Sequence, residues 1–103
     1  MHARVTQVRI LPNKVEEFVA SVQSVIPMLH QQKGFRGLLV LQGDATAPQE
    51  ATVVALWDSL EALRASEKSM FLYQALSRIL TSCEGFPVIR EQKVMISDSC
   101  GHS

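Results

Sequence analysis

The chain has 103 residues, the size of one domain, and 47% of them are apolar, so a packed core is expected rather than disorder. Ten Lys and Arg balance ten Asp and Glu, which gives no general attraction for nucleic acid or for an anionic membrane surface. The longest apolar run, Val53 to Trp57, is too short to span a bilayer, and the first residues lack a signal peptide's apolar stretch, so a cytoplasmic protein is expected.

A strand and a long helix are predicted at the start of the chain. Residues 3–11 alternate in the manner of a strand, with Thr6, Val8 and Ile10 expected to face the core and Val5, Gln7 and Arg9 on the other face. After Pro12 a helical stripe predicts a helix that ends near Lys33, and its apolar positions are Val15, Phe18, Val19, Val22, Ile26 and Leu29. Pro27 removes one backbone hydrogen bond, so a kink or an early helix end is expected there.

Two strands follow, at residues 35–42 and 51–58, joined by a polar turn at 43–50. Many of their residues are apolar on both faces, whereas a sheet covered on one side should alternate. With only two helical regions in the chain, nothing is left to cover a second sheet face. A second copy of the protein is the simplest cover, so a homodimer with a two-fold interface is expected.

The last third of the chain predicts a broken helix and a fourth strand. Asp58 or Ser59 is expected to cap the helix, because Glu61 lies at capping-box spacing from Asp58. Residues 66–69 interrupt the helical pattern, which predicts two pieces, and Gly85 is expected to end the second.

A strand at residues 88–96 completes the order βαββαβ, which predicts an α+β, ferredoxin-like domain over 1–96 with a four-stranded antiparallel sheet. Residues 97–103 are expected to form a flexible tail.

Three segments of the sequence are similar to one known family. PNKVEEF at 12–18 resembles the start of the family's first helix, KGFRG at 33–37 its Pro-Gly-Phe-x-Gly junction, and WDSLEAL at 57–63 its strand-to-helix signature. Over residues 3–96 the chain thus resembles the antibiotic biosynthesis monooxygenase (ABM) family. That resemblance implies a dimeric α+β barrel and a family that includes cofactor-free oxygenases, haem-degrading enzymes and isomerase-like proteins.

The family's working residues match this chain at few positions. Where the haem-degrading branch has Asn, Trp and His, this chain has Thr6, Ser66 and Ala75, so haem chemistry is not expected. In the quinone-forming branch a Trp ends the third strand, and Trp57 resembles it. The branch's Asn, Tyr and Arg fall near Val53, Leu63 and Tyr73.

Three residues are the candidate catalytic positions. Trp57 could stack on a flat aromatic substrate, or be a core or interface residue. Tyr73 could place its hydroxyl in a cleft between helix and sheet, or lie on the surface. Thr6 could hydrogen-bond a ligand, or a nearby carbonyl.

Other polar residues receive structural interpretations. Gln7 and Arg9 are expected on the dimer side of the sheet, where Glu91 could pair with them. His30 lies near a helix C-terminus, which suits an imidazolium, although a catalytic base is an alternative. Cys100 and His102 could bind a metal, but two ligands make a weak metal site, so no metal or other cofactor is expected.

Two principal functions remain open from the sequence. The first is a cofactor-free monooxygenase acting on a small aromatic or quinol-like compound. The alternative is a non-catalytic dimer that binds a small hydrophobic ligand or has a regulatory role, and an isomerase or lyase is a third possibility. An open, polar-lined cleft between helices and sheet would favour an enzyme, and a cleft filled by Leu, Val and Phe would favour a binding protein.

Overall fold

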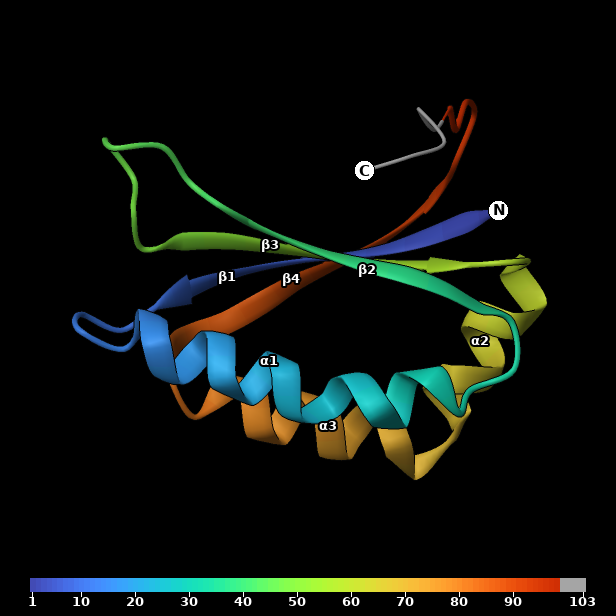
Figure 1. Cartoon of the computed structure of the whole chain (residues 1–103), viewed down its shortest axis with the longest axis horizontal. Coiled ribbons are helices and arrows are strands. Elements are labelled where there is room, and N and C mark those ends of the chain that lie inside the picture. The colour runs from blue at the N-terminus through green and yellow to red at the C-terminus, as the bar shows by residue number, and fades with distance from the viewer. Residues whose placement is uncertain (99–103) are drawn as a thin grey trace.

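Four strands and three helices follow one another along the chain (Figure 1). The computed structural model describes residues 1–98, so Cys100, His102 and most of the predicted tail lie outside the described residues. The elements are β1 (His2–Ile10), α1 (Val15–His30), β2 (Phe35–Gln42), β3 (Glu50–Trp57), α2 (Leu60–Lys68), α3 (Met70–Leu80) and β4 (Cys83–Lys93).

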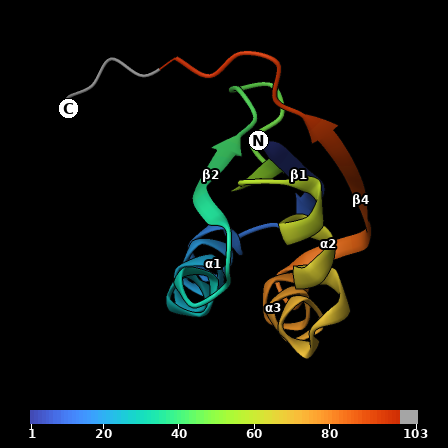
Figure 2. The ribbon, with the colours of Figure 1, turned by 90° about the vertical axis from the view of Figure 1, so that its right-hand side faces the viewer.

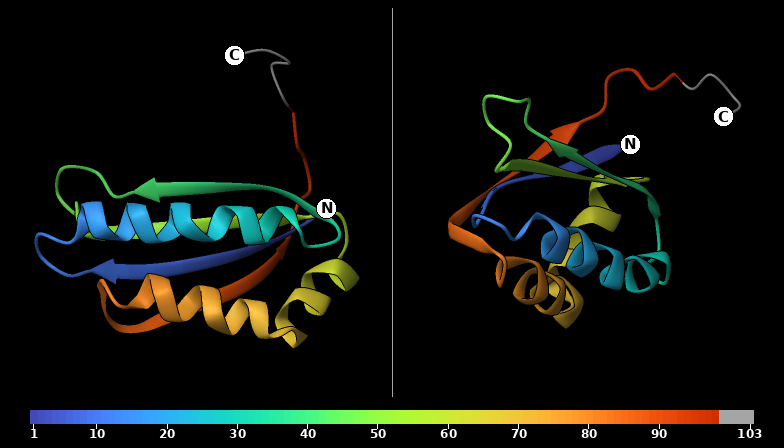
Figure 3. Two further views of the ribbon diagram at one scale, coloured as in Figure 1. Left: turned by 60° about the horizontal axis from the view of Figure 1, so that its bottom comes forward. Right: turned by 60° about the vertical axis from the view of Figure 1, so that its left-hand side comes forward.

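The strands form one antiparallel sheet in the order β2-β3-β1-β4. Helices α1 and α3 lie side by side against one face of this sheet, and α2 connects β3 to α3 at one end (Figures 2 and 3). This arrangement confirms the predicted α+β ferredoxin-like fold. Within residues 1–98, no helix is long and apolar enough to cross a membrane.

The core lies between the helices and the covered sheet face. Thr6, Val8 and Ile10 of β1 are buried, as their alternation predicts. On α1 the buried residues are Phe18, Val22, Val25 and Leu29. Val25 therefore takes the inward position expected of Ile26, because the helix is rotated slightly relative to the predicted stripe.

Helix α1 continues through Pro27 and ends at His30. The early end that Pro27 permits does not occur, and we attribute this to the burial of Leu29, which favours one more helical turn. The helix nevertheless stops before the predicted end at Lys33. Gly34 then turns the chain into β2 with a φ of 84°, a left-handed conformation that suits glycine.

The second helical region is broken, as predicted, with the boundary at Ser69. Ser59 caps α2 by accepting a hydrogen bond from the Ala62 amide. Of the two predicted caps, Ser59 is therefore confirmed, and the predicted capping box between Asp58 and Glu61 was wrong. Helix α3 ends at Leu80, well before Gly85. Gly85 instead lies inside β4 with a φ of 72°. The pairing of β4 with β1 is irregular at this point.

The uncovered sheet face carries an apolar surface on its strands. Leu39 and Leu41 on β2 are 55% and 51% exposed, and Val88 on β4 is 47% exposed. Arg9 pairs with Glu84 at 2.8 Å. Glu91 lies opposite Arg4, on the covered face. The prediction that it pairs with Gln7 or Arg9 was therefore wrong. Alternation within β4 does not say which of its two faces meets the helices, and the pairing with β1 decides this.

Candidate functional site

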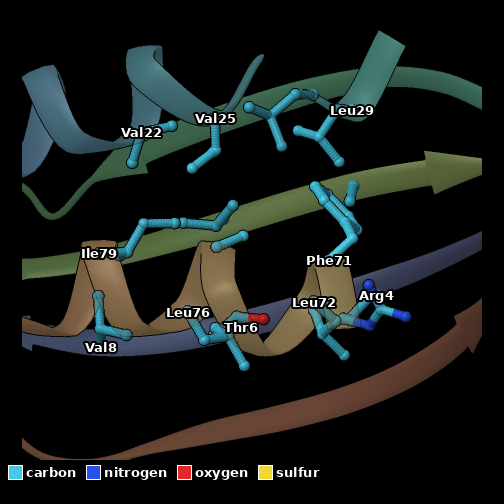
Figure 4. A pocket seen from close by; sticks show the side chains of 14 residues that line it. Arg4, Thr6, Val8, Val22, Val25, Leu29, Phe71, Leu72, Leu76 and Ile79 are labelled. Atoms are coloured by element: carbon cyan, nitrogen blue, oxygen red, sulfur yellow. The ribbon is translucent and has the colours of Figure 1, made fainter. Parts of the chain in front are cut away.

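A cavity of about 60 Å³ lies between the sheet and helices α1 and α3. Side chains from both helices and from β1, β2 and β3 line it (Figure 4). Twelve of its fourteen lining residues are apolar, and the other two are Arg4 and Thr6. The cleft is thus mainly filled by aliphatic and aromatic side chains, with polar groups only along β1.

Arg4 is buried, with 4% of its surface exposed. Its Nη2 donates to the Leu63 carbonyl at 3.0 Å and to the Ser66 hydroxyl at 2.8 Å, both on α2. The same nitrogen lies 3.3 Å from a carboxylate oxygen of Glu67. Its Nε is buried and has no hydrogen-bond partner within residues 1–98. The guanidinium is therefore held to α2 through one nitrogen while another remains available.

Helix α2 supplies these anchors because Leu63 and Ser66 lie three residues apart on its buried face. Ser66 also donates to the Leu63 carbonyl at 2.6 Å, which fixes its hydroxyl as the acceptor for Arg4. The sequence predicts no role for Ser66, which only differs from the residue that the haem-degrading branch has at this position. Its role here is to position a buried cation.

Burial lowers the pKa of Arg4, and the nearby Glu67 carboxylate opposes that shift. An arginine side chain is effectively always protonated in proteins, so the group stays cationic in spite of its burial. Glu91 of β4 lies across the strand pair from Arg4 and also favours its charged form. Arg4 is the charged residue that contributes to the cavity lining in the described part of the chain.

Thr6 lies two residues beyond Arg4 on the same face of β1. It is 7% exposed and lines the cavity, as the sequence predicts for a residue able to contact a ligand. Figure 4 shows Arg4, Thr6 and Val8 in a row along the strand. Two adjacent inward positions on a strand are about 7 Å apart, so Arg4 and Thr6 can contact different parts of one small molecule.

Trp57 is completely buried, with 0% of its surface exposed, and it does not line the cavity. Its ring packs against Phe35 in an edge-to-face arrangement at a centroid distance of 5.4 Å. The guanidinium carbon of Arg4 lies 5.8 Å from its ring centroid, within range of a cation–π contact. Trp57 thus packs behind Arg4, and a ligand in the cavity would not stack on it.

Tyr73 points away from the cavity. Its side chain is 73% exposed on the outer side of α3, so the structure does not bring its hydroxyl to Thr6. Leu72, its neighbour, lines the cavity instead. One residue along a helix corresponds to a rotation of about 100°, which is enough to separate a cavity position from a solvent-facing one.

His30 lies at the C-terminal end of α1 and its ring meets the edge of Phe35 at 5.6 Å. It does not line the cavity. Over residues 1–98 there is no group of three His, Cys, Asp or Glu side chains arranged to hold a metal ion.

A second groove of about 360 Å³ runs between α1 and the edge strand β2. Gln23 and Gln42 are its polar lining residues, and no ionisable side chain contributes to it. It has room for a ligand but offers no ionisable group that could move a proton. The cavity beside Arg4 is therefore the better candidate site.

The alternation of β1 predicts that Arg4 also faces inward, although Arg4 was not among the candidate site residues. Arg4 shares the inward face of Thr6, Val8 and Ile10 by simple two-residue spacing. A charged residue in a series of inward positions is rare, since arginine is almost never fully buried unless it is paired. Such an exception marks a candidate site more clearly than an aromatic residue at a strand end.

The chain is similar to known proteins both in sequence pattern and in fold. Residues 1–75 match the model of the family described as antibiotic biosynthesis monooxygenase. None of the curated proteins is significantly similar to the chain in sequence. A candidate antibiotic biosynthesis monooxygenase from Bordetella bronchiseptica has a TM-score of 0.80 at 16% identity, with 92% of this chain and 97% of that chain covered.

Two further structures are similar. A candidate antibiotic biosynthesis monooxygenase from Caulobacter crescentus has a TM-score of 0.75 at 18% identity, covering 92% of this chain and 90% of its own. A conserved protein from Methanosarcina mazei has a TM-score of 0.75 at 19% identity, covering 90% of this chain and 92% of its own. At these identities the likeness shows the fold alone.

Proposed function

Because this chain belongs to the antibiotic biosynthesis monooxygenase family, we propose that it oxygenates a small aromatic or quinol-like compound without a bound cofactor. The observation that carries the proposal is the cavity itself, which is apolar and bordered by one buried cation. Its volume of about 60 Å³ is well below the ~300 Å³ at which drug-sized pockets begin. Because a cavity that holds benzene has about 150 Å³, the cavity must widen to admit even a single-ring compound, which is therefore the largest substrate that we propose.

The chemistry needs no external reductant if the substrate supplies all the electrons. Conversion of a phenol to a quinone changes one ring C–H into C=O, which is a four-electron oxidation. Those four electrons reduce O₂, so one oxygen atom forms the new carbonyl and the other leaves as water with the two released hydrogens. The substrate's own conjugated ring stabilises the carbanion that reacts with O₂, and the protein contributes a dry site with fixed hydrogen-bond donors.

Non-catalytic binding of a small hydrophobic compound is the second candidate function. It is favoured by two observations: the cleft is filled mainly by apolar side chains, and within residues 1–98 no carboxylate or imidazole lines the cavity to act as a general base. In that case the cavity would hold a ligand without transforming it. Oxygen uptake separates the two functions, since ligand binding alone consumes no O₂.

Filling the cavity is expected to abolish activity while the protein stays folded. Ala75 is buried and lines the cavity, so Ala75→Leu would place three additional carbon atoms in the free space. We expect oxygen uptake with single-ring phenols and hydroquinones to fall at least ~10-fold, because loss of a well-oriented bound geometry has effects of this size or larger. An oxygen electrode provides the measurement, and the melting temperature confirms folding.

The matched control is Ala20→Leu, which makes the same change at an exposed position of α1. It should keep wild-type oxygen uptake. If both variants remain fully active, the cavity is not the site. Absence of oxygen uptake by the wild type on all such substrates, together with saturable ligand binding, would support the binding function instead.

We also infer that the protein forms a homodimer through its uncovered sheet face. The support is the exposed apolar surface on β2 and β4, with no helix of the described chain over it (Figure 2). Contiguous exposed apolar surface of this kind marks a contact site in soluble proteins. A second copy is self-complementary to such a face through a two-fold axis.

Light scattering at micromolar concentration is expected to give twice the chain mass of 11.4 kDa. Replacing both Leu39 and Leu41 with Asp should shift the protein to monomer, since four charges would then face one another across the interface. Val19→Asp is the control, because Val19 is 42% exposed but lies on the helical side. A wild-type monomer with intact strands would contradict the inference.

A further inference from the structure

The two edge strands of the sheet differ in how well they are protected from pairing with another strand. β2 and β4 are the edges of the order β2-β3-β1-β4. Charged side chains and prolines are common means of keeping an edge strand from pairing, and β4 contains Pro87, Arg90, Glu91 and Lys93. Residues 37–42 of β2 have the sequence GLLVLQ, without a charge or a proline. β2 is therefore the unprotected edge.

Both sides of the β2 edge are apolar. Leu39 and Leu41 are about half exposed on the uncovered face of the sheet. On the other side, Leu38 and Val40 line the groove of about 360 Å³ between β2 and α1. Within residues 1–98 only β3 pairs with β2, so the backbone groups on its outer side have no strand partner there. An apolar edge of this kind is a template for pairing with another extended segment.

The segment that follows β4 is apolar and makes almost no contact with its own domain. Met95 and Ile96 are 91% and 87% exposed. The Val94 amide donates a hydrogen bond of 3.0 Å to the Met1 carbonyl, so the segment leaves the sheet from a defined point. It extends on the side of the sheet opposite to the helices (Figures 1 and 2). Adjacent apolar side chains with this exposure indicate a contact with another molecule.

We propose that residues 94–96 of a second copy pair as a short strand with the outer edge of β2, so that each copy of the dimer covers the unprotected edge of the other. This inference rests on the proposed homodimer and names the segment that completes its interface. A copy that docks on the uncovered face has its own β2 at the border of that interface, because Leu39 and Leu41 belong to the same face. The exchange is reciprocal, as a two-fold axis requires.

The alternation of side chains along a strand suits both sides of this edge. Successive side chains of an extended segment point in opposite directions. One of Met95 and Ile96 therefore enters the groove beside α1, and the other packs with Leu39 and Leu41 on the uncovered face. The apolar character of both residues is thus matched by the apolar character of both sides of β2.

Charged residues beside the two strands favour an antiparallel pairing. Lys93 precedes the segment and Asp98 follows it, while Arg36 lies at the start of β2 and Asp44 follows its end. In the antiparallel direction Asp98 lies towards Arg36, which is 57% exposed and can contact a carboxylate in addition to that of Asp58. Lys93 then lies towards Asp44. The parallel direction would place Lys93 near Arg36, and like charges across a strand pair are destabilising.

Sedimentation velocity over a dilution series tests the proposal through the dissociation constant of the dimer. Met95→Ser combined with Ile96→Ser is expected to raise this constant at least ~10-fold, because two apolar contacts are lost from each copy. Met70→Ser combined with Tyr73→Ser is the control. It removes two large side chains that are 70% and 73% exposed on α3, and it should leave the dissociation constant unchanged. Dimerisation of the Met95 and Ile96 variant at the wild-type affinity would overturn the proposal.

Amide hydrogen exchange identifies what covers the edge. In the wild-type dimer the outward amides of β2 should exchange slowly, because they donate to the paired segment. Dilution below the dissociation constant, or the Met95 and Ile96 substitutions, should accelerate this exchange at least ~10-fold. Slow exchange that persists on dilution would show that the edge is covered within one chain. Fast exchange in the wild-type dimer would show that no strand pairs with it, and either result refutes the proposal.

Failure of the segment exchange can be distinguished from failure of the dimer itself. A monomeric wild type would refute both. A wild-type dimer that dissociates on replacement of Leu39 and Leu41 with Asp, but not on replacement of Met95 and Ile96 with Ser, would support contact through the sheet face and refute the pairing of residues 94–96 with β2.

Discussion

Trp57→Ala is expected to lower the free energy of unfolding by about 3–5 kcal/mol, the usual cost of deleting a large buried aromatic side chain. Trp57 is fully buried, and its ring packs against both Phe35 and the guanidinium of Arg4. Removing it would leave a cavity at the end of β3. Arg4 and its hydrogen-bond partners on α2 could then rearrange. Urea unfolding at a fixed protein concentration measures the change.

Two controls separate packing from other effects. Trp57→Phe retains an aromatic ring against Phe35 and should cost clearly less than the alanine variant. Tyr73→Ala deletes an aromatic side chain that is 73% exposed, so its effect should stay within about 0.5 kcal/mol. A loss below about 1 kcal/mol for Trp57→Ala would show that the buried position is less tightly packed than the structure indicates.

The fold of this chain is well determined by local patterns. Two-residue alternation places Thr6, Val8 and Ile10 on the covered face, and the apolar runs at β2 and β3 identify two further strands. The break between α2 and α3 is also visible, because a run of polar residues interrupts the stripe. These features depend on neighbours in sequence, which is why sequence interpretation recovers them.

Features that depend on tertiary structure were predicted less well. The alternation of β4 does not say which of its faces meets the helices, and the pairing with β1 places Glu91 opposite Arg4 rather than beside Arg9. Tyr73 shows the same limit on a helix, because the rotation of α3 about its own axis decides whether it or Leu72 meets the cavity. Neither the strand register nor the helix rotation is encoded by a residue's nearest neighbours.

The candidate site combines both kinds of information. Thr6 could be predicted, since its inward direction follows from alternation. Arg4 has the same direction, but its importance depends on α2, which lies some sixty residues later in the chain and supplies Leu63 and Ser66 as acceptors. The break at Ser69 lets α2 carry these acceptors over β1 while α3 forms the apolar wall of the cavity. The anchors of Arg4 and the apolar wall on the α3 side of the cavity thus come from separate helices.

Gly34→Ala is expected to be strongly destabilising, because it combines a backbone cost with a steric clash. Gly34 has a φ of 84°, which costs a residue with a Cβ about 1–2 kcal/mol. A Cβ at this position would also lie 2.5 Å from the Cβ of Ala62 on α2, so β2 and α2 would have to separate. Overpacking of this kind typically costs a further ~1–3 kcal/mol.

Gly85→Ala provides the matched control, because Gly85 has a similar φ of 72° but its added Cβ would meet no atom within 4 Å. It should therefore show only the backbone cost of about 1–2 kcal/mol, and the difference between the two variants isolates the clash with Ala62. The Gly34 carbonyl also accepts a hydrogen bond of 2.8 Å from the Asp58 amide at the start of the α2 region, so a displaced Gly34 would disturb the junction that positions α2 over Arg4. Urea unfolding of both variants measures the costs, and equal losses would show that the contact between Gly34 and Ala62 can relax freely.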